Sequence, residues 1–290
     1  MALTWGLVAA VLGGALLHAL WNTLVKSSGD KELDTALVHL LGAVVALPML
    51  AWTGLPPTQA WPYIAASLTV HVAYYITLAG AYRHGDLSLT YPIMRGTAPL
   101  LVSLGSGLVL GEALSAQAWF GVLAITAGVA LVGLSHAGRL LRHRAAIGYA
   151  LANAVVIATY TFIDGQGVRV TVAAGHVVMS YVVILFVLDG IPYPALVWLR
   201  RGPAQRQAML AYARQRGLLA ACGGLASLGS YAVALWAMTR APVAVVAALR
   251  ESSVLFATAL SVWVLKERFG PQRLAGALVI VAGVVTLRFA

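Results

Sequence analysis

The sequence predicts an all-α integral membrane protein with ten transmembrane helices, arranged as two inverted five-helix repeats. Three observations support this prediction. The 290 residues are 61% hydrophobic and only 10% charged, with a mean hydropathy of +0.87. Soluble domains carry about 25% charged residues, so most of this protein's outer surface must face something other than water. In addition, the apolar residues form ten long runs, and motifs of the first half of the chain recur in the second.

The ten apolar runs have the length of membrane spans. A helix needs about 20 mostly apolar residues to cross a bilayer core. Most of the links are short, so neighbouring helices should be antiparallel. The first run lacks the basic start and cleavage site of a signal peptide, so we expect it to be retained. The predicted spans are Leu3–Val25, Leu33–Trp52, Trp61–Tyr82, Leu87–Leu110, Ala116–Leu134, Ala145–Phe162, Thr171–Leu188, Gly217–Met238, Pro242–Leu265 and Gln272–Leu287.

Two links are longer than the others and rich in arginine. Ser135–Arg144 divides the chain into a first repeat (1–134), a basic linker (135–144) and a second repeat (145–290). Arg200–Arg216 contains five arginines. We expect a solvated loop there, and the alternative is a helix lying on anionic lipid at the membrane surface.

The late part of the first half recurs 155 residues later. Arg95 matches Arg250, and Tyr75 matches Tyr231 with an offset of 156. A unit with five crossings must place its tandem copy upside down, which gives the inverted repeat found in many secondary transporters. The other pairs at the offset of 155 are Leu110 with Leu265, Glu112 with Glu267, Gly121 with Gly276 and Gly128 with Gly283.

These duplicated segments resemble the drug/metabolite transporter superfamily, in particular its ten-helix EamA-type members. The resemblance covers essentially the whole chain and is carried by Leu110-Gly111-Glu112, Leu265-Lys266-Glu267 and the glycines that follow each. Pro99 and the opening His18-Ala19-Leu20-Trp21-Asn22 are also similar to family members. The resemblance implies transport of small metabolites through a central cavity without a nucleotide-driven motor.

Arg95 and Arg250 are the strongest candidates for substrate binding. Each lies midway along a predicted span, where a charge costs about 2.5–3.5 kcal/mol on insertion scales. Such residues face a cavity or pair with another polar group. The alternative is a structural ion pair, which Glu251 beside Arg250 makes plausible.

Further polar and aromatic residues lie within the spans. They could bind a polar substrate or hold neighbouring helices together by hydrogen bonds. The candidates for binding are His18, Trp21 and Asn22 in span one, His71, Tyr74 and Tyr75 in span three, Tyr160 in span six and Tyr231 in span eight. Asn153 and Asp164 in span six, with Ser227 and Ser230 in span eight, share the same features.

Two other duplicated features have structural interpretations. Glu112 and Glu267 each lie at the end of a span, where we expect a capping or turn role rather than proton coupling. Glycines seven apart share one helix face and allow close helix approach, so we assign them to packing.

Together these features predict a secondary transporter, either a permease or an exporter, of a small polar, anionic or zwitterionic metabolite that works by alternating access. Arginine forks match carboxylate and phosphate groups. Efflux of amino acids or amphiphilic drugs is the alternative within transport. A membrane-embedded enzyme or a lipid flippase-like protein is the alternative from another class. The sequence shows no catalytic dyad, nucleotide-binding loop or metal-ligand spacing, so we expect no enzyme activity, cofactor or metal.

The basic residues bear on partners and orientation. The net charge is +10, but the charges are dispersed between apolar stretches, so we expect membrane lipid and not nucleic acid as partner. A proton is the candidate coupling ion, and monomer and homodimer remain open. We expect a multi-pass protein of the cell (inner or plasma) membrane. The links opposite the termini carry 14 of the 19 Lys and Arg residues, against 3 on the side of the termini. The charge rule therefore places both termini outside, whereas the family resemblance favours cytoplasmic ends.

Overall fold

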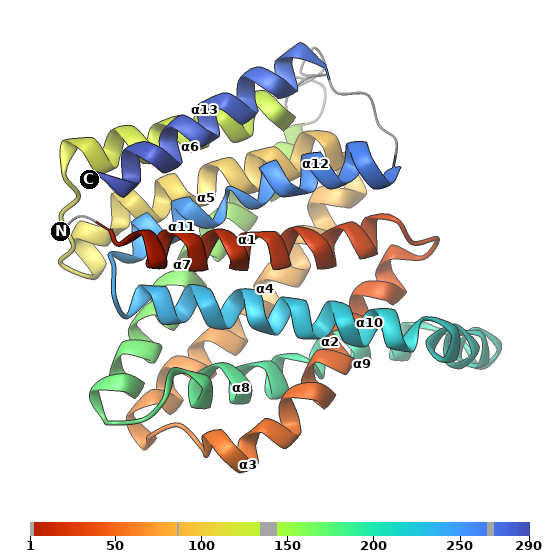
Figure 1. Ribbon diagram of the computed structural model, residues 1–290. Coiled ribbons are helices and arrows are strands. Elements are labelled where there is room, and N and C mark those ends of the chain that lie inside the picture. Colours follow the sequence, from red (N-terminus) through yellow and green to blue (C-terminus); the bar gives the residue numbers. More distant parts are fainter. Residues whose placement is uncertain (1–2, 86, 134–143, 266–269) are drawn as a thin grey trace.

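The computed structural model of the protein describes residues 3–85, 87–133, 144–265 and 270–290, which form helices joined by turns (Figure 1). In chain order, the elements are α1 (Trp5–Lys26), α2 (Lys31–Ala46), the 3-10 helix η1 (Leu47–Met49), α3 (Leu50–Thr53), the 3-10 helix η2 (Thr58–Ala60), α4 (Trp61–His84), α5 (Leu87–Val109), α6 (Ala116–Gly133), α7 (Arg144–Ala173), α8 (Val178–Asp189), α9 (Pro192–Arg200), α10 (Pro203–Met238), α11 (Val243–Arg250), α12 (Ser253–Leu265) and α13 (Pro271–Arg288).

Nine helical segments of the described chain are long and apolar enough to cross a membrane. Some of them combine two or three elements: α2 to α3, η2 with α4, α8 with α9, and α11 with α12. The helix α5 is of similar length, at 23 residues, and contains Pro92, Arg95 and Pro99. With α5 included, the order of the helices follows the ten predicted spans.

Side chains and glycines at the helix ends explain where several elements begin or stop. Thr4 Oγ1 accepts a hydrogen bond from Leu7 N at 3.2 Å, and Asp30 Oδ1 accepts one from Leu33 N at 2.9 Å. These caps satisfy amide groups that the first turn of a helix leaves without partners. After α5, Gly111 turns the chain with a φ of 68°, a conformation that favours glycine.

The segment Arg200–Arg216 is mostly helical, so the predicted solvated loop is wrong. Only a short turn separates α9 from α10, which then continues for 36 residues without a break. Pro203 stands in the first turn of α10, where its fixed φ suits a helix. The Ala, Gln, Arg, Leu and Met residues that follow are good helix formers.

Two arginines of this segment pair with acidic residues near the start of α2. Arg201 Nη2 lies 3.1 Å from Asp30 Oδ2 and 3.0 Å from Glu32 Oε2. Arg216 Nη2 lies 2.6 Å from Asp34 Oδ2, and Asp34 is buried. These contacts join the start of α2 to α10 and to the turn that precedes it.

Span six is also longer than predicted, because α7 continues past Phe162 to Ala173. Asp164 and Arg169 follow the predicted end of the span, and both have partners inside the bundle. Consequently, the next span begins later than predicted, at Val178. Most of the predicted linker 135–144 lies outside the described residues, and Arg144 is the first residue of α7.

The last helices of the two repeats, α6 and α13, pack side by side in opposite directions (Figure 1). A Cβ on Gly128 would lie 2.7 Å from the carbonyl oxygen of Gly276, and one on Gly121 would lie 3.1 Å from that of Gly283. The sequence repeat matches Gly121 with Gly276 instead, and Gly128 with Gly283. Equivalent helices therefore meet antiparallel, as an inverted repeat requires. The predicted packing role of these glycines is confirmed.

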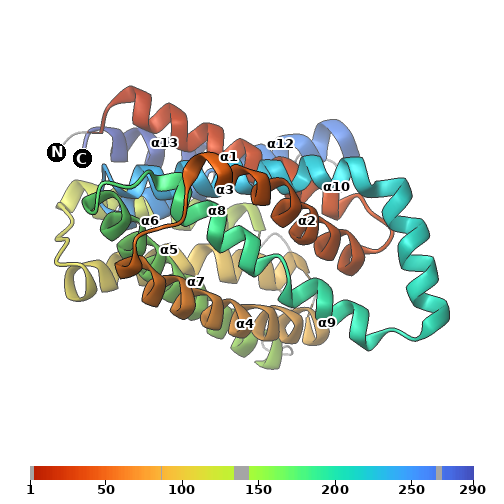
Figure 2. The same ribbon diagram turned by 90° about the horizontal axis from the view of Figure 1, so that it is seen from below.

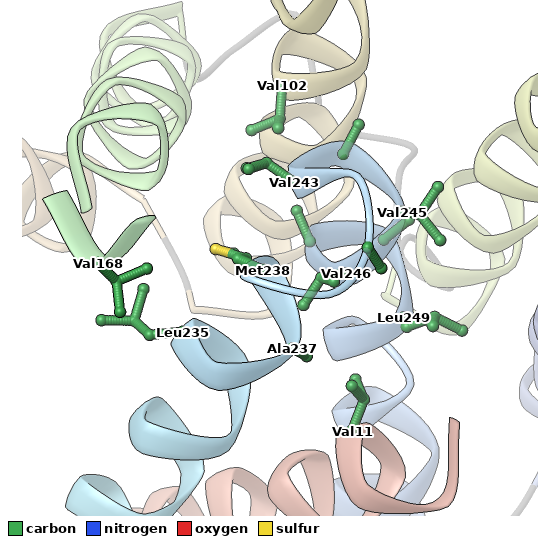
Figure 3. Packing of buried hydrophobic residues seen from close by; sticks show 14 of the residues in the cluster. Val11, Val102, Val168, Leu235, Ala237, Met238, Val243, Val245, Val246 and Leu249 are labelled. Atoms are coloured by element: carbon green, nitrogen blue, oxygen red, sulfur yellow. The ribbon is translucent and has the colours of Figure 1, made fainter. Parts of the chain in front are cut away.

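The helix α11 lies at the centre of the bundle. All its residues from Val243 to Leu249 are buried, as expected of a helix that is apolar all round. Figure 3 shows it surrounded by Val102 of α5, Met238 of α10 and Val11 of α1. The charged residues that follow α11 are thereby placed deep in the protein.

Both termini lie at the same end of the bundle (Figures 1 and 2). The ring centroids of Trp5 and Phe289 are 6.3 Å apart, and the Arg288 guanidinium lies 4.8 Å from the Trp5 ring centroid. An even number of crossings brings the two ends of the chain to one side of the membrane.

Candidate functional site

The ninth membrane segment is broken in its middle. Between α11 and α12, the amide of Glu251 bonds to the carbonyl of Ala248 and that of Ser252 to Leu249, a spacing of three residues. The tighter 3-10 spacing within a helix often marks a functional position. Discontinuous membrane helices line the substrate sites of many secondary transporters. The sequence alone predicted an unbroken span here.

A small cavity adjoins this break and is lined by both symmetric arginines. Its volume of about 10 Å³ admits about one water molecule. Arg95 comes from α5 and Arg250 from the end of α11, which are equivalent segments of the two repeats. The complete lining is Arg95, Ala98, Pro99, Val102, Ile157, Tyr160, Thr161, Ala247, Arg250 and Glu251.

Glu251 pairs with Arg95 of the other repeat and not with its neighbour Arg250. Arg95 Nε lies 2.9 Å from Glu251 Oε2, and the two side chains are only 11% and 7% exposed. Neither atom makes a hydrogen bond in the described part of the chain, so the charges touch without an aligned N–H···O contact. The structure thus contains the ion pair foreseen at this position, but with a different arginine.

Arg250 makes no ion pair within the described residues. Its guanidinium instead lies 5.4 Å from the ring centroid of Tyr231 on α10, a cation–π contact. The Tyr231 hydroxyl donates a hydrogen bond to Asp164 Oδ2 on α7. The Tyr181 hydroxyl on α8 donates one to Asp164 Oδ1 at 2.8 Å. Asp164 is fully buried.

The aromatic residues of span three divide between two places. His71 stacks on Tyr160 at a centroid distance of 4.6 Å, and Tyr74 meets the Tyr160 ring edge to face at 6.2 Å. Of these three residues, Tyr160 lines the cavity, and His71 and Tyr74 contact its ring. Tyr75 turns away from it, since its hydroxyl donates to Asp189 Oδ2 at 3.0 Å and its ring stacks on a tyrosine of α9.

The three predicted binding residues on α1 differ in their surroundings. His18 lies within electrostatic range of both Arg95 and Arg250. Its ring meets Trp21 edge to face at 5.3 Å. Asn22 donates its side-chain amide to the backbone carbonyl of His18 at 2.7 Å, so it is occupied within its own helix.

Asn153 and Glu112 have structural partners. Asn153 Nδ2 donates to Thr77 Oγ1 at 2.8 Å and to the Tyr74 carbonyl at 3.1 Å, which joins α7 to α4. Glu112 Oε2 accepts from Val243 N at 2.9 Å, and its Oε1 lies 2.5 Å from Arg169 Nη2. It therefore caps α11, as expected of a carboxylate beside a turn. Its mate Glu267 lies outside the described residues.

Arg95, Arg250, Glu251, Asp164, Tyr231 and Tyr181 form a layer of polar side chains next to the cavity, here called the polar layer. Sequence reasoning missed Tyr181 as a member of it. Tyr181 lies in a continuous apolar run, and its side chain gives no periodic signal. The only available clue was Asp164, because a carboxylate in a membrane span needs donors from neighbouring helices.

Comparison with known proteins agrees with this architecture. The model of the EamA-like transporter family matches residues 4–134 and again residues 144–289. The chain belongs to the EamA-like transporter family. A solved protein crystal structure, 19% identical in sequence, resembles the chain over 96% of both chains with a TM-score of 0.72, which shows a shared fold. A search of curated proteins found no match.

Membership in the EamA-like family makes this chain a multi-pass membrane transporter of the drug/metabolite transporter type. The two family matches cover the two halves that carry the sequence repeat. In the EamA architecture, the cavity between Arg95 and Arg250 lies where equivalent segments of the two halves meet.

Proposed function

We propose that the protein carries a small anionic or zwitterionic metabolite across the cell membrane by alternating access, with the substrate bound between Arg95 and Arg250. The observation that carries this proposal is the pair of symmetric arginines on one buried cavity. Inverted-repeat transporters bind substrate between their repeats, near the bilayer midplane.

The charges that line the cavity favour an anionic group. Among the lining residues, Arg95, Arg250 and Glu251 together carry one net positive charge. A net charge in the membrane interior is costly unless it is compensated. A carboxylate, phosphate or phosphonate would compensate it, and two guanidinium groups can bind such groups through paired hydrogen bonds.

The small cavity fits an occluded conformation. Room for about one water molecule does not admit a metabolite, so the helices around the break must separate to load it. The inverted repeat supplies a physical basis for this motion, because the pseudo-two-fold axis relates a rearrangement of one half to an equivalent rearrangement of the other.

Thermal unfolding of the purified protein in detergent tests the proposal. The panel contains lactate, succinate, inorganic phosphate, methylphosphonate, alanine and choline. We expect at least one anion or the zwitterion to raise the melting temperature. A ligand present at 100 times its dissociation constant stabilises the folded state by about 2.7 kcal/mol.

Two arginine variants make the test specific. Arg250→Met should abolish the stabilisation, because it removes the unpaired guanidinium from the cavity. The matched control is Arg240→Met. Arg240 also lies over an aromatic ring, that of Trp236 at 4.8 Å, but it is exposed and does not line the cavity. Stabilisation by choline alone, or an undiminished response of Arg250→Met, would contradict the proposal.

A further inference from the structure

Asp164 is the second acidic residue of the polar layer around the cavity. It is fully buried and makes no ion pair within the described part of the chain. Both of its oxygens accept hydrogen bonds from tyrosine hydroxyls, one from α8 and one from α10. Two donors stabilise a carboxylate but do not compensate its charge, which burial in a membrane protein makes costly.

Tyr231 connects Asp164 directly to the candidate substrate site. Its hydroxyl bonds to Asp164, while its ring lies beneath the guanidinium of Arg250. A ligand bound to Arg250 would therefore affect the hydrogen bond that Asp164 accepts from Tyr231. Arg95 contacts the carboxylate of Glu251, whereas Arg250 is connected to the carboxylate of Asp164 through Tyr231.

Several polar groups surround Asp164. From α4 come His71 and Ser67, from α7 itself Tyr160, from α8 Tyr181 and from α10 Tyr231. Beyond these lie Arg250 of α11, behind the Tyr231 ring, and Arg95 of α5, which contacts Glu251. His71 is stacked on Tyr160 and lies within electrostatic range of Asp164. Of the two buried acids Glu251 and Asp164, only Glu251 forms an ion pair with an arginine within the described residues.

We propose that Asp164 is the proton-binding site of this transporter and gains a proton when negative charge arrives at Arg250. With Asp164 ionised, the charges of Arg95, Arg250, Glu251 and Asp164 sum to zero. With Asp164 protonated they sum to +1, which one substrate anion returns to zero. One proton carried with each monoanion thus keeps the layer neutral both empty and loaded.

The coupling to substrate rests on the proposed function, but the proton site can be tested without any ligand. Infrared difference spectra of the purified protein, recorded over a range of pH, report the carbonyl band of a protonated carboxylic acid. We expect a band that appears as the pH falls, that is absent in Asp164→Asn and that is retained in Glu251→Gln. Spectra of Asp164→Asn in which every titrating band of the parent is retained would overturn the proposal.

Tyrosine variants keep the test valid if Asp164→Asn does not fold. Tyr231→Phe and Tyr181→Phe each remove one hydrogen bond to the carboxyl group, so each should shift the frequency of the band. A band that stays in place in both variants belongs to another carboxyl group and overturns the assignment.

Arg250→Met tests the coupling, because it removes positive charge as a bound anion would neutralise it. Linkage between the two positions is reciprocal, so the acid form of Asp164 should persist to higher pH in this variant. Arg250→Lys keeps the charge and should titrate like the parent. An unchanged titration in Arg250→Met would show that the two residues are independent and would overturn the coupling. If the proton site is confirmed and no member of the ligand panel binds, only the proposed substrate class fails.

Discussion

Arg95 of the first repeat and Glu251 of the second form a buried ion pair across the centre of the protein, with Nε and Oε2 2.9 Å apart. Arg250, the sequence equivalent of Arg95, lies on the same cavity and forms no ion pair within the described residues. Related positions in the two halves thus have different electrostatic environments. The proposed substrate site rests on this asymmetry.

The Arg95–Glu251 pair should be mutually dependent. Arg95→Met leaves a buried carboxylate unpaired, and Glu251→Gln leaves a second guanidinium unpaired, so each should lower the free energy of unfolding by about 3–5 kcal/mol. The double variant Arg95→Met/Glu251→Gln should recover much of this loss, because neither member of the pair then remains as an unpaired buried charge. Denaturant unfolding in detergent measures all three. Additive losses in the double variant would mean that the two side chains do not interact.

Close approach of α6 and α13 should not tolerate a side chain at Gly128. A Cβ there would lie 2.7 Å from the Gly276 carbonyl oxygen and 2.5 Å from Ile280 Cγ1. Since backbone must move to accommodate it, Gly128→Ala should destabilise the protein by about 1–3 kcal/mol.

The control for this prediction is Gly13→Ala, because a Cβ at Gly13 in α1 meets nothing within 4 Å. This substitution should be neutral or stabilising by up to about 1 kcal/mol, the difference in helix propensity. Thermal unfolding of both variants gives the comparison. Equal melting temperatures would show that the tight contact has no energetic consequence.

Glu112 should stabilise the protein by capping α11. Glu112→Ala removes the acceptor for Val243 N and the partner of Arg169, so it should cost about 1–3 kcal/mol. Glu112→Gln retains an acceptor oxygen and should cost less. Glu32→Ala is the control, because Glu32 is 49% exposed in its pair with Arg201 and exposed pairs contribute about 0–1 kcal/mol. A larger loss in Glu32→Ala than in Glu112→Ala would refute the capping role.

The distribution of Lys and Arg predicts that both termini lie outside the cell. The side opposite the termini carries Lys26, Lys31 and Arg83, the arginines of 139–144 and 200–216, and the basic residues of 266–273, 14 in all. Links rich in these residues stay in the cytoplasm.

Reporter fusions after Ala290 measure this orientation. Active alkaline phosphatase and an absent green-fluorescent signal would support the prediction. The opposite pair of signals would favour the cytoplasmic ends that the family resemblance implies.

The sequence alone was sufficient for the class, the order of the helices and the repeat. Apolar runs of about 20 residues have few alternatives to membrane helices. The recurrence of Arg95 as Arg250 exposed the repeat, and an odd number of crossings in each unit implies the inversion. The glycine contacts followed as well, because glycines seven apart share one helix face. These properties depend on local composition and spacing, which a sequence displays directly.

Only the tertiary structure decided which charges meet. Adjacency in sequence favoured Glu251 with Arg250, but neighbouring helical residues point about 100° apart, and the carboxylate instead contacts Arg95 on α5. The helix α7 continues beyond the predicted span because Asp164 and Arg169 have partners on other helices, which the sequence does not show. Likewise, nothing local distinguishes Tyr181 from its apolar neighbours. Polar residues in a membrane are stabilised by groups distant in the chain, so their roles depend on how the helices pack.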